Sequence, residues 1–469
     1  MNSKLVSLFC CLIMLVSFSG CTKVTQLVKD NQPTKAELLA EINEEHQRWE
    51  AAPAADPTPY LRHYDDPADA QKYFDYVTDT YSEYDAAKEL SLEEAEEDVN
   101  YLFDAFYYDF AFYDYFGGHT VFDQAKAEIL QELQAKDNLT CKDLQEVLVK
   151  HLTFIKDGHF NINHNFPAEK EIPFFFRQVM FVKTDSGYQD SNGKTVVSVD
   201  GHPDLDALFK RSISKEGYLV YYPVLLKKAK FDGTEWDKHV CDEQLTVHYA
   251  DGSTDVLTAD TWSQYYKDLP KGQNTDLRQT DGIPVFQFNH FDPSFLEETN
   301  AAAAQMSNAE ISMLDLRSNV GGYEEVAHQW FNRYSHQRVF GTGVRYSVLP
   351  ASLVASPSTS KTPRASNDNI LILLSGKCSA SCAEITLDLS YNLDNSLIIG
   401  ENTNGSMISN SGHIELPNSK CSVDMTFSTV YLTPDGFDYF EELRGFFPDI
   451  WVPAKEAETL AAKLMENLK

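Results

Sequence analysis

The spacing of hydrophobic and polar residues divides the chain into a helical part, a β-rich part and a part where strands and helices alternate. From 66 to 153, apolar residues recur at helical spacing among acidic ones. Ser91 and Glu94 have the spacing of a capping box, so a helix is predicted to begin there. We interpret the aromatic run 106–116 as core packing rather than a ligand platform. Further helices are predicted over about 120–135 and 140–156.

The β-rich part covers about 172–281 and consists of short apolar runs separated by turn residues. One strand and turn is predicted over 196–203. A hairpin is predicted over 245–257, because Asp251 and Gly252 stand between two alternating segments.

From 283 onward, buried strands alternate with helices, which is typical of a layered α/β domain built from βαβ units. The predicted strands are 285–288, 311–316, 370–375 and 396–400, and the predicted helices are 294–306, 323–334 and 380–393.

Composition narrows the class of protein. The 469 residues suggest two or three domains, and 43% hydrophobic with 12% aromatic residues can build a substantial core. Lys and Arg number 39 against 71 Asp and Glu, a formal charge of −32. This acidity argues against a nucleic-acid partner, since phosphates are neutralised by clustered Lys and Arg. The sequence shows no repeat of 20–50 residues, which excludes a solenoid or propeller.

The N-terminus has the pattern of a targeting segment. Lys4 precedes an apolar stretch over 5–16 that is too short to span a bilayer comfortably, so 1–20 is predicted to be a signal peptide. Residues 18–21 resemble a bacterial lipobox, which implies that Cys21 is lipidated. We therefore expect a protein of the cell envelope, tethered to a membrane through Cys21, with 21–60 as a lipid-anchored tether that contains a short helical pattern over 35–49. A plain secretory signal is the alternative.

The remaining cysteines are too scattered for a disulfide framework. One bridge is compatible with an oxidising envelope, and the spacing does not identify its partners. No zinc-binding pattern is found, and we expect neither a metal nor a cofactor. These cysteines are Cys141, Cys241, Cys378, Cys382 and Cys421.

Three loops that follow predicted strands of the α/β part carry candidate chemistry. The first ends in the pair Gly321 and Gly322, whose backbone N–H groups could bind an oxyanion. The second places Ser381 where a strand turns into a helix, so its hydroxyl would lie beside the free N–H groups of the helix start. An ordinary N-cap serine is the alternative interpretation. The third is the loop 400–405.

Together, the patterns DLRxNxGG, SxSxxE and GExTxG resemble the S41 peptidases, which include the C-terminal processing proteases and the tricorn protease core. The resemblance covers about 283–453 and, weakly, the region from about 100. It implies a ClpP/crotonase-like layered α/β catalytic domain in which Ser381 is the nucleophile. An oxyanion hole would be formed by the amides of Gly321 or Gly322 and of Cys382, and Glu384 stands at the matching glutamate position.

The chain departs from the tail-specific members at one position. Ser406 stands where those proteases carry the lysine base, and a hydroxyl cannot replace an amine in that role. The tricorn-like branch uses a histidine in a DGH loop and a late glutamate. The sequences 157–159 (DGH) and 442–449 (E-x-x-G-x-x-P-D) resemble these segments, which implies His159 as base and Glu442 as the orienting acid.

Several residues compete for these roles. Lys377 and Lys420 are alternative amine bases, although each is more simply explained as a solvated charge. His151 and His164 are rivals of His159 outside the matching motif, and Glu441 is the immediate rival of Glu442.

The predicted domains after the tether are an N-terminal helical domain over 61–165, a β-rich subdomain over 166–281 and the catalytic domain over 282–469. The β-rich subdomain is PDZ-like at most in degenerate form, since it contains no Gly-rich carboxylate-binding loop.

The functional hypothesis is a lipoprotein serine endopeptidase that cleaves peptides or unfolded proteins. The alternative is a catalytically inactive relative that carries a ligand or binds peptides, motivated by Ser406 in place of lysine. A glycan-binding or structural lipoprotein is a third interpretation, which rests on location alone.

Overall fold

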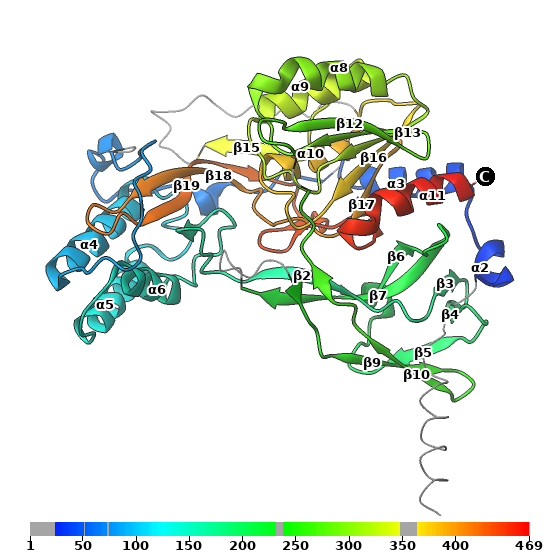
Figure 1. The fold of residues 1–469 in the computed structure, drawn as a ribbon, viewed down its shortest axis with the longest axis horizontal. Helices are drawn as coiled ribbons and strands as arrows, with labels where there is room; N and C mark the ends of the chain where they lie inside the picture. Colours follow the sequence, from blue (N-terminus) through cyan, green and yellow to red (C-terminus); the bar gives the residue numbers. More distant parts are fainter. Residues whose placement is uncertain are drawn as a thin grey trace, which may run out of the picture.

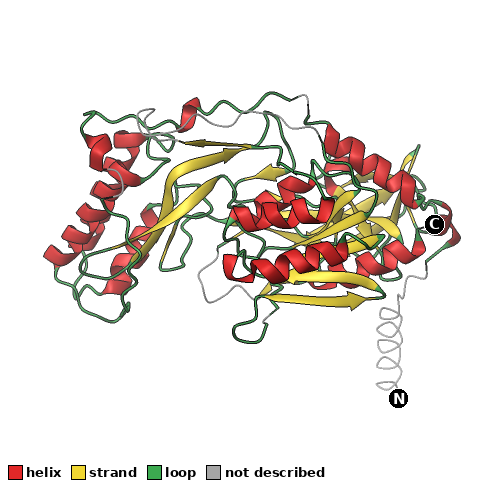
Figure 2. Ribbon diagram, turned by 90° about the horizontal axis from the view of Figure 1, so that it is seen from above, coloured by secondary structure: helices red, strands yellow, loops and turns green. Residues whose placement is uncertain are grey.

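The computed structural model describes residues 24–50, 52–72, 75–230, 238–267, 269–347 and 364–468. The predicted signal peptide and Cys21 lie outside these residues. Among the helices that are described, none has the length and apolar character needed to cross a bilayer. Figures 1 and 2 show an α/β body with a group of helices at one end.

A six-stranded sheet forms the centre of the body, and its last five strands run parallel. The first strand pairs with the second in antiparallel register. The strands are, in spatial order, β12 (Thr275–Thr280), β13 (Ile283–Phe288), β14 (Ile311–Asp315), β16 (Ile370–Ser375), β17 (Ser396–Gly400) and β22 (Ile450–Trp451).

Helices cover both faces of this sheet, which explains the continuous apolar run of β16. Leu371 and Leu373 pack into one core, while Ile372 and Leu374 pack into the other. A strand buried on both sides has no polar alternation. The first face is covered by α8 (Leu296–Met306), α9 (Glu324–Ser335) and α10 (Cys382–Ser390), and the second by α3 (Lys35–Gln47) and α11 (Ala457–Asn467). The predicted layered α/β class is confirmed.

The helical part contains α4 (Leu92–Asp109), α5 (Gly118–Gln134) and α6 (Cys141–His151). The predicted capping box is present, because Ser91 and Glu94 each bond to the other's backbone N–H. The aromatic run forms core, as predicted, and this core also includes apolar side chains of a long hairpin. The hairpin consists of β18 (Ser409–Glu415) and β19 (Ser422–Leu432), with β15 (Val344–Ser347) and β1 (Asn161–Ile162) pairing along β19.

This hairpin belongs to the 282–469 segment of the chain, yet it packs against the helices of the 61–165 segment (Figure 1). The Ala111 amide donates to the Thr426 carbonyl at 2.8 Å across this contact. The 61–165 and 282–469 segments therefore share a hydrophobic core.

The β-rich part contains two further sheets. One is built from β2 (Lys170–Phe175), β7 (Leu219–Ala229), β3 (Phe181–Thr184) and β4 (Gly187–Asp190), with β6 (Phe209–Ile213) along β7 and α7 (Leu205–Leu208) before it. The other is built from β10 (Thr254–Thr258), β9 (Gln244–Tyr249) and β5 (Val196–Val199). The predicted hairpin forms between β9 and β10. β12, inside the expected range of this subdomain, instead joins the central sheet.

The expected tether over 21–60 is wrong for residues 26–47, which pack on the body as α2 (Gln26–Asp30) and α3. Val28 enters a small core with β3 and β7. Leu38 and Ile42 are buried against the central sheet. The buried His46 imidazole Nε2 lies 2.9 Å from Asp449 Oδ1, which adds a polar contact to this packing.

The packing of α3 predicts that Ile42→Ala lowers the free energy of unfolding by about 2–5 kcal/mol, the usual cost of this truncation in a core. Glu44→Ala on the exposed face of the same helix is the matched control. Urea unfolding measures both variants. Equal stabilities for the two variants would show that α3 does not pack on the sheet.

Candidate active site

Ser381 stands at the corner where β16 leads into α10, as predicted. Its backbone has φ 54° and ψ −118°, a region that residues with a side chain rarely adopt. Such strain costs about 1–3 kcal/mol and persists only where the surroundings hold it in place. Ser381 also occupies the N-cap position of α10, so the N-cap interpretation and the nucleophile interpretation are compatible.

The carboxylate of Glu384 holds this corner. Its Oε2 accepts the Ser381 amide at 3.1 Å and the Ser406 amide at 2.8 Å. Its Oε1 accepts the Gly405 amide at 2.7 Å and the Thr403 hydroxyl. Glu384 is fully buried, and burial raises its pKa against the effect of these donors. One side chain thus joins the serine corner to the loop 403–406.

Gly321 lies directly against Ser381. Its φ is +107°, and a Cβ built on it would stand 2.9 Å from the Ser381 Cβ. A Cβ on Gly322 would stand 2.4 Å from the Phe291 carbonyl oxygen. Any larger residue at either position would therefore push against neighbouring atoms, which explains the glycine pair.

The three predicted oxyanion donors differ in availability. The Gly321 amide donates to the Asn319 Oδ1 at 2.8 Å and is therefore already bound. Within the described part of the chain, the amides of Gly322 and Cys382 have no hydrogen-bond acceptor. Cys382 is the first residue of α10 and follows Ser381, so its amide is the best-placed donor.

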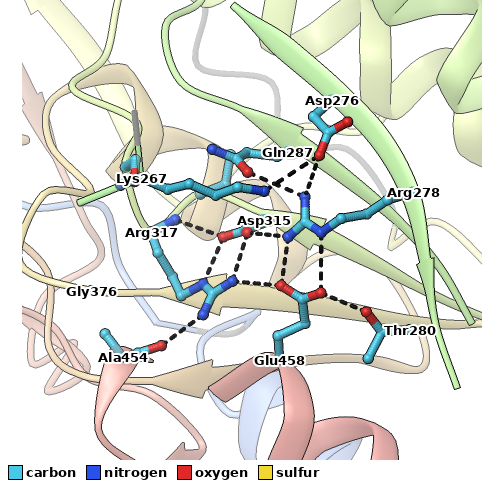
Figure 3. A network of polar contacts seen from close by, with 12 residues as sticks. Lys267, Asp276, Arg278, Thr280, Gln287, Asp315, Arg317, Gly376, Ala454 and Glu458 are labelled. Atoms are coloured by element: carbon cyan, nitrogen blue, oxygen red, sulfur yellow. Dashed lines mark hydrogen bonds and ion pairs between the residues drawn. The ribbon is translucent and has the colours of Figure 1, made fainter. Parts of the chain in front are cut away.

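A buried ion network fixes the base of the glycine loop (Figure 3). The Arg317 guanidinium contacts both Asp315 oxygens at 2.8 and 2.7 Å and reaches Glu458 at 2.7 Å. Arg278 also donates to Asp315, at 2.9 Å. Burial alone would raise the pKa of Asp315, but the two guanidinium groups hold it below its usual value. The Asp and Arg of the DLR pattern are thus structural.

His159 extends from the predicted loop of Asp157, Gly158 and His159. The His159 amide donates to the Asp157 Oδ1 at 3.0 Å, and the His159 Nδ1 lies 3.9 Å from the same oxygen. The other Asp157 oxygen accepts the Thr426 hydroxyl of β19 at 2.6 Å. Burial lowers the pKa of the mostly buried imidazole, while Asp157 acts in the opposite direction. Asp157, the carboxylate beside the imidazole, belongs to the DGH pattern, but the sequence analysis assigned the role of supporting acid to Glu442.

The Glu442 side chain binds the backbone of the same loop. Its Oε1 accepts the Gly158 amide at 2.8 Å, and its Oε2 accepts the Ile408 amide at 3.4 Å. Burial raises the pKa of Glu442, with further contributions from the charges of Asp157 and Glu384. The rival Glu441 is exposed and pairs with Arg444 at 2.5 Å. Glu442 thus binds main-chain amides through both carboxylate oxygens, and its role as the orienting acid stays a prediction.

The histidine loop lies against the loop that Glu384 holds. A Cβ built on Gly158 would stand 2.1 Å from the Gly405 carbonyl oxygen and 2.7 Å from the Ser406 Cα. The amides of Gly405 and Ser406 share the Glu384 carboxylate with the Ser381 amide. The Glu384 carboxylate therefore links the serine segment to the loop against which the histidine segment lies. A hydrogen bond between the Ser381 and His159 side chains stays a prediction.

The expectation of a solvated charge is wrong for Lys377. Its side chain is buried, and its Nζ donates to the Thr403 carbonyl. Burial, aided by the charge of Lys170, lowers the pKa of Lys377 to about 7. The bond to Thr403 gives Lys377 a structural role.

The remaining rivals have partners of their own. Lys420 pairs with Glu415 at 3.3 Å on the hairpin, and His151 pairs with Glu132 at 2.7 Å between helices. His164 lines a separate cavity of about 410 Å³. The five cysteines outside the segment 1–23 are free thiols.

Residues 283–452 match the family model described as Peptidase family S41. No curated protein matches the chain significantly. Mature CPAF complexed with lactacystin is 15% identical and aligns over 80% of this chain and 97% of its own, with a TM-score of 0.43. A putative peptidase from Parabacteroides merdae is 14% identical over 80% and 95%, with a TM-score of 0.38. The tricorn protease is 12% identical over 81% and 37%, with a TM-score of 0.37. At these TM-scores, the overall likeness supports no inference about the site.

The contact of Gly321 with Ser381 predicts that Gly321→Ala prevents labelling of the protein by a serine-reactive fluorophosphonate. Gly201→Ala is the matched control, because Gly201 also has a positive φ, of +73°, but a Cβ added to it would meet no atom within 4 Å. Both variants incur the left-handed strain of about 1–2 kcal/mol, and only the first displaces Ser381. Undiminished labelling of Gly321→Ala would show that the glycine loop does not shape the site.

Proposed function

We propose that this chain, whose residues 283–452 match the model of peptidase family S41, is a serine endopeptidase that cleaves peptides or unfolded proteins. The observation that carries the proposal is the arrangement around Glu384. Its carboxylate binds the amides of Ser381 and Ser406, and Ser406 in turn contacts the loop of His159. A strained serine at a helix start, next to a glycine turn and linked to a histidine loop through one buried carboxylate, suits acyl transfer.

The proposed reaction has two halves. The His159 imidazole takes the proton of the Ser381 hydroxyl as the oxygen attacks the substrate carbonyl carbon. The resulting oxyanion is bound by the Cys382 amide and by the glycine loop. The imidazolium gives its proton to the leaving amine, and the C–N bond breaks to leave an ester on Ser381. Water, deprotonated by His159, then hydrolyses this ester.

The surroundings of His159 support its role as a base. Burial favours the neutral imidazole, the form that accepts a proton. Asp157 lies near enough to stabilise the imidazolium that forms in the transition state. Glu442 contributes by holding the Gly158 amide, which fixes the loop from which the imidazole extends.

The alternative function is an inactive carrier or peptide-binding protein, favoured by Ser406 in the place of the tail-specific lysine. Ser406 is buried, and its hydroxyl donates to the Asn404 Oδ1 at 3.1 Å. This hydroxyl therefore has a structural bond where the tail-specific proteases carry an amine.

The proposed location is the cell envelope, with the chain held at a membrane through lipid on Cys21. This part of the proposal rests on the sequence of residues 1–21 alone. Metabolic labelling with a fatty-acid analogue tests it, since Cys21→Ala should abolish incorporation.

Replacing the nucleophile tests the enzymatic proposal. Ser381→Ala should lower turnover of an unfolded protein roughly 10⁴–10⁶-fold and abolish fluorophosphonate labelling, with little change in thermal stability. Ser186→Ala, at an exposed serine in the turn between β3 and β4, is the matched control and should remain fully active. Labelled Ser381→Ala would exclude Ser381 as nucleophile, and an unlabelled wild-type protein would favour the carrier.

The pH dependence tests the assigned base. Because burial lowers the pKa of His159, the acid limb of kcat/KM should have its midpoint below 6.5, with activity lost as pH falls through it. Asp157→Asn should move this midpoint to still lower pH, since the Asp157 charge favours the imidazolium. A midpoint at or above 6.5 in the wild type, or an upward shift in the variant, would contradict the assignment.

A further inference from the structure

Lys170 is a fully buried charge that the proposed reaction does not use. It begins β2, in the β-rich part of the chain, and none of its side chain is exposed. Its Nζ donates to the Gly158 carbonyl at 3.1 Å and to the Asn404 Oδ1. The ammonium therefore joins the histidine loop to the loop that Glu384 holds.

We propose that Lys170 is a positioning residue for His159, which it holds by the peptide group that precedes the imidazole. The proposal rests on the function proposed above for the same site. It assigns to a strand outside the matched 283–452 segment a part in aligning the catalytic base.

The bonds around Gly158 carry the proposal. The peptide group between Gly158 and His159 is held at both ends, because Lys170 binds its carbonyl and Asp157 Oδ1 accepts its N–H at 3.0 Å. The preceding peptide group is held by its N–H, which donates to Glu442 at 2.8 Å. Three charged side chains thus bind two consecutive peptide groups. Such a backbone leaves the imidazole little freedom beyond its own χ angles.

The burial of Lys170 favours a specific role over simple packing. Transferring an ammonium out of water costs several kcal/mol unless opposite charges and hydrogen bonds compensate. The compensating carboxylates come from three different segments: Glu384 from α10, Glu442 from the segment before β21 (Gly445–Phe446), and Asp157 from the histidine loop. The Phe166 ring covers the ammonium at 4.5 Å. Each carboxylate also contacts the backbone of the serine or histidine segment or of the loop between them.

Lys170 also accounts for the hydroxyl at position 406. The Asn404 Oδ1 accepts both the Lys170 ammonium and the Ser406 hydroxyl. A lysine at 406 would bring another positive charge to a cluster that already holds Lys170 and Lys377, whose charges repel. Ser406 satisfies the amide oxygen without adding charge.

The test compares Lys170→Met and Lys170→Gln with Lys183→Met, a half-exposed lysine of the same subdomain that pairs with Asp206. The methionine variant loses both donor and charge, so kcat should fall at least tenfold with KM nearly unchanged. The glutamine variant keeps an uncharged donor and should retain more of kcat. Lys183→Met should match the wild type in both constants.

A second readout does not depend on turnover. The His159 imidazole is titrated by NMR in the Ser381→Ala protein, its resonance being assigned by its loss in His159→Gln. The charges that act on His159 are those of Asp157, Lys170 and Asp424. Because the Lys170 charge lowers the pKa of His159, both Lys170 variants should raise it, and Lys183→Met should not.

The two readouts separate the proposals. An unchanged kcat and an unchanged His159 pKa in folded Lys170 variants would overturn the positioning role. If the wild type itself shows no turnover, the proposed function fails. An unchanged His159 titration in the Lys170 variants would then also overturn the positioning role of Lys170. If Lys170→Met does not fold, Lys170→Gln decides by the same two measurements.

Discussion

The rest of the site depends on the hydrogen bonds that the buried carboxylate of Glu384 accepts from backbone amides. A charged group with no exposed surface must be surrounded by donors, and Glu384 finds them in the Ser381 corner and in the loop 403–406. These donors belong to segments that follow neighbouring parallel strands, β16 and β17. The same bond that compensates the buried charge also holds Ser381 in its strained conformation. Ligand sites at the carboxyl ends of parallel strands follow from this topology.

The second feature of the site is that its parts come from separate regions of the chain. The histidine loop follows the helical part, and Asp157 ties it to Thr426 on the hairpin. Lys170 comes from the β-rich part. The common core of the helices and the hairpin is therefore part of what places the imidazole, because it fixes the loop relative to the central sheet.

The central features of the fold were predictable because their signals are local. The apolar run of β16 and the capping box at Ser91 each depend on a few consecutive residues. The corner at Ser381 could be placed for the same reason, as a short segment between a strand and a helix.

What could not be predicted depends on contacts between distant segments. Lys377 and Lys170 resemble surface lysines in sequence, and only the carboxylates brought to them by folding make burial tolerable. The apolar face of α3, formed by Leu38 and Ile42, is weak. Its burial could not be predicted because it depends on contact with the central sheet. β12 likewise belongs to the central sheet only through its pairing with β13.

The most direct test of the account is the separation of the Ser381 Oγ and the nearer His159 ring nitrogen. It is measured in a crystal structure of the protein with a peptide boronic acid bound at Ser381. The account predicts a separation of about 2.6–3.2 Å, or one water that bridges the two atoms. An imidazole directed away from Ser381, with the inhibitor bound, would contradict it.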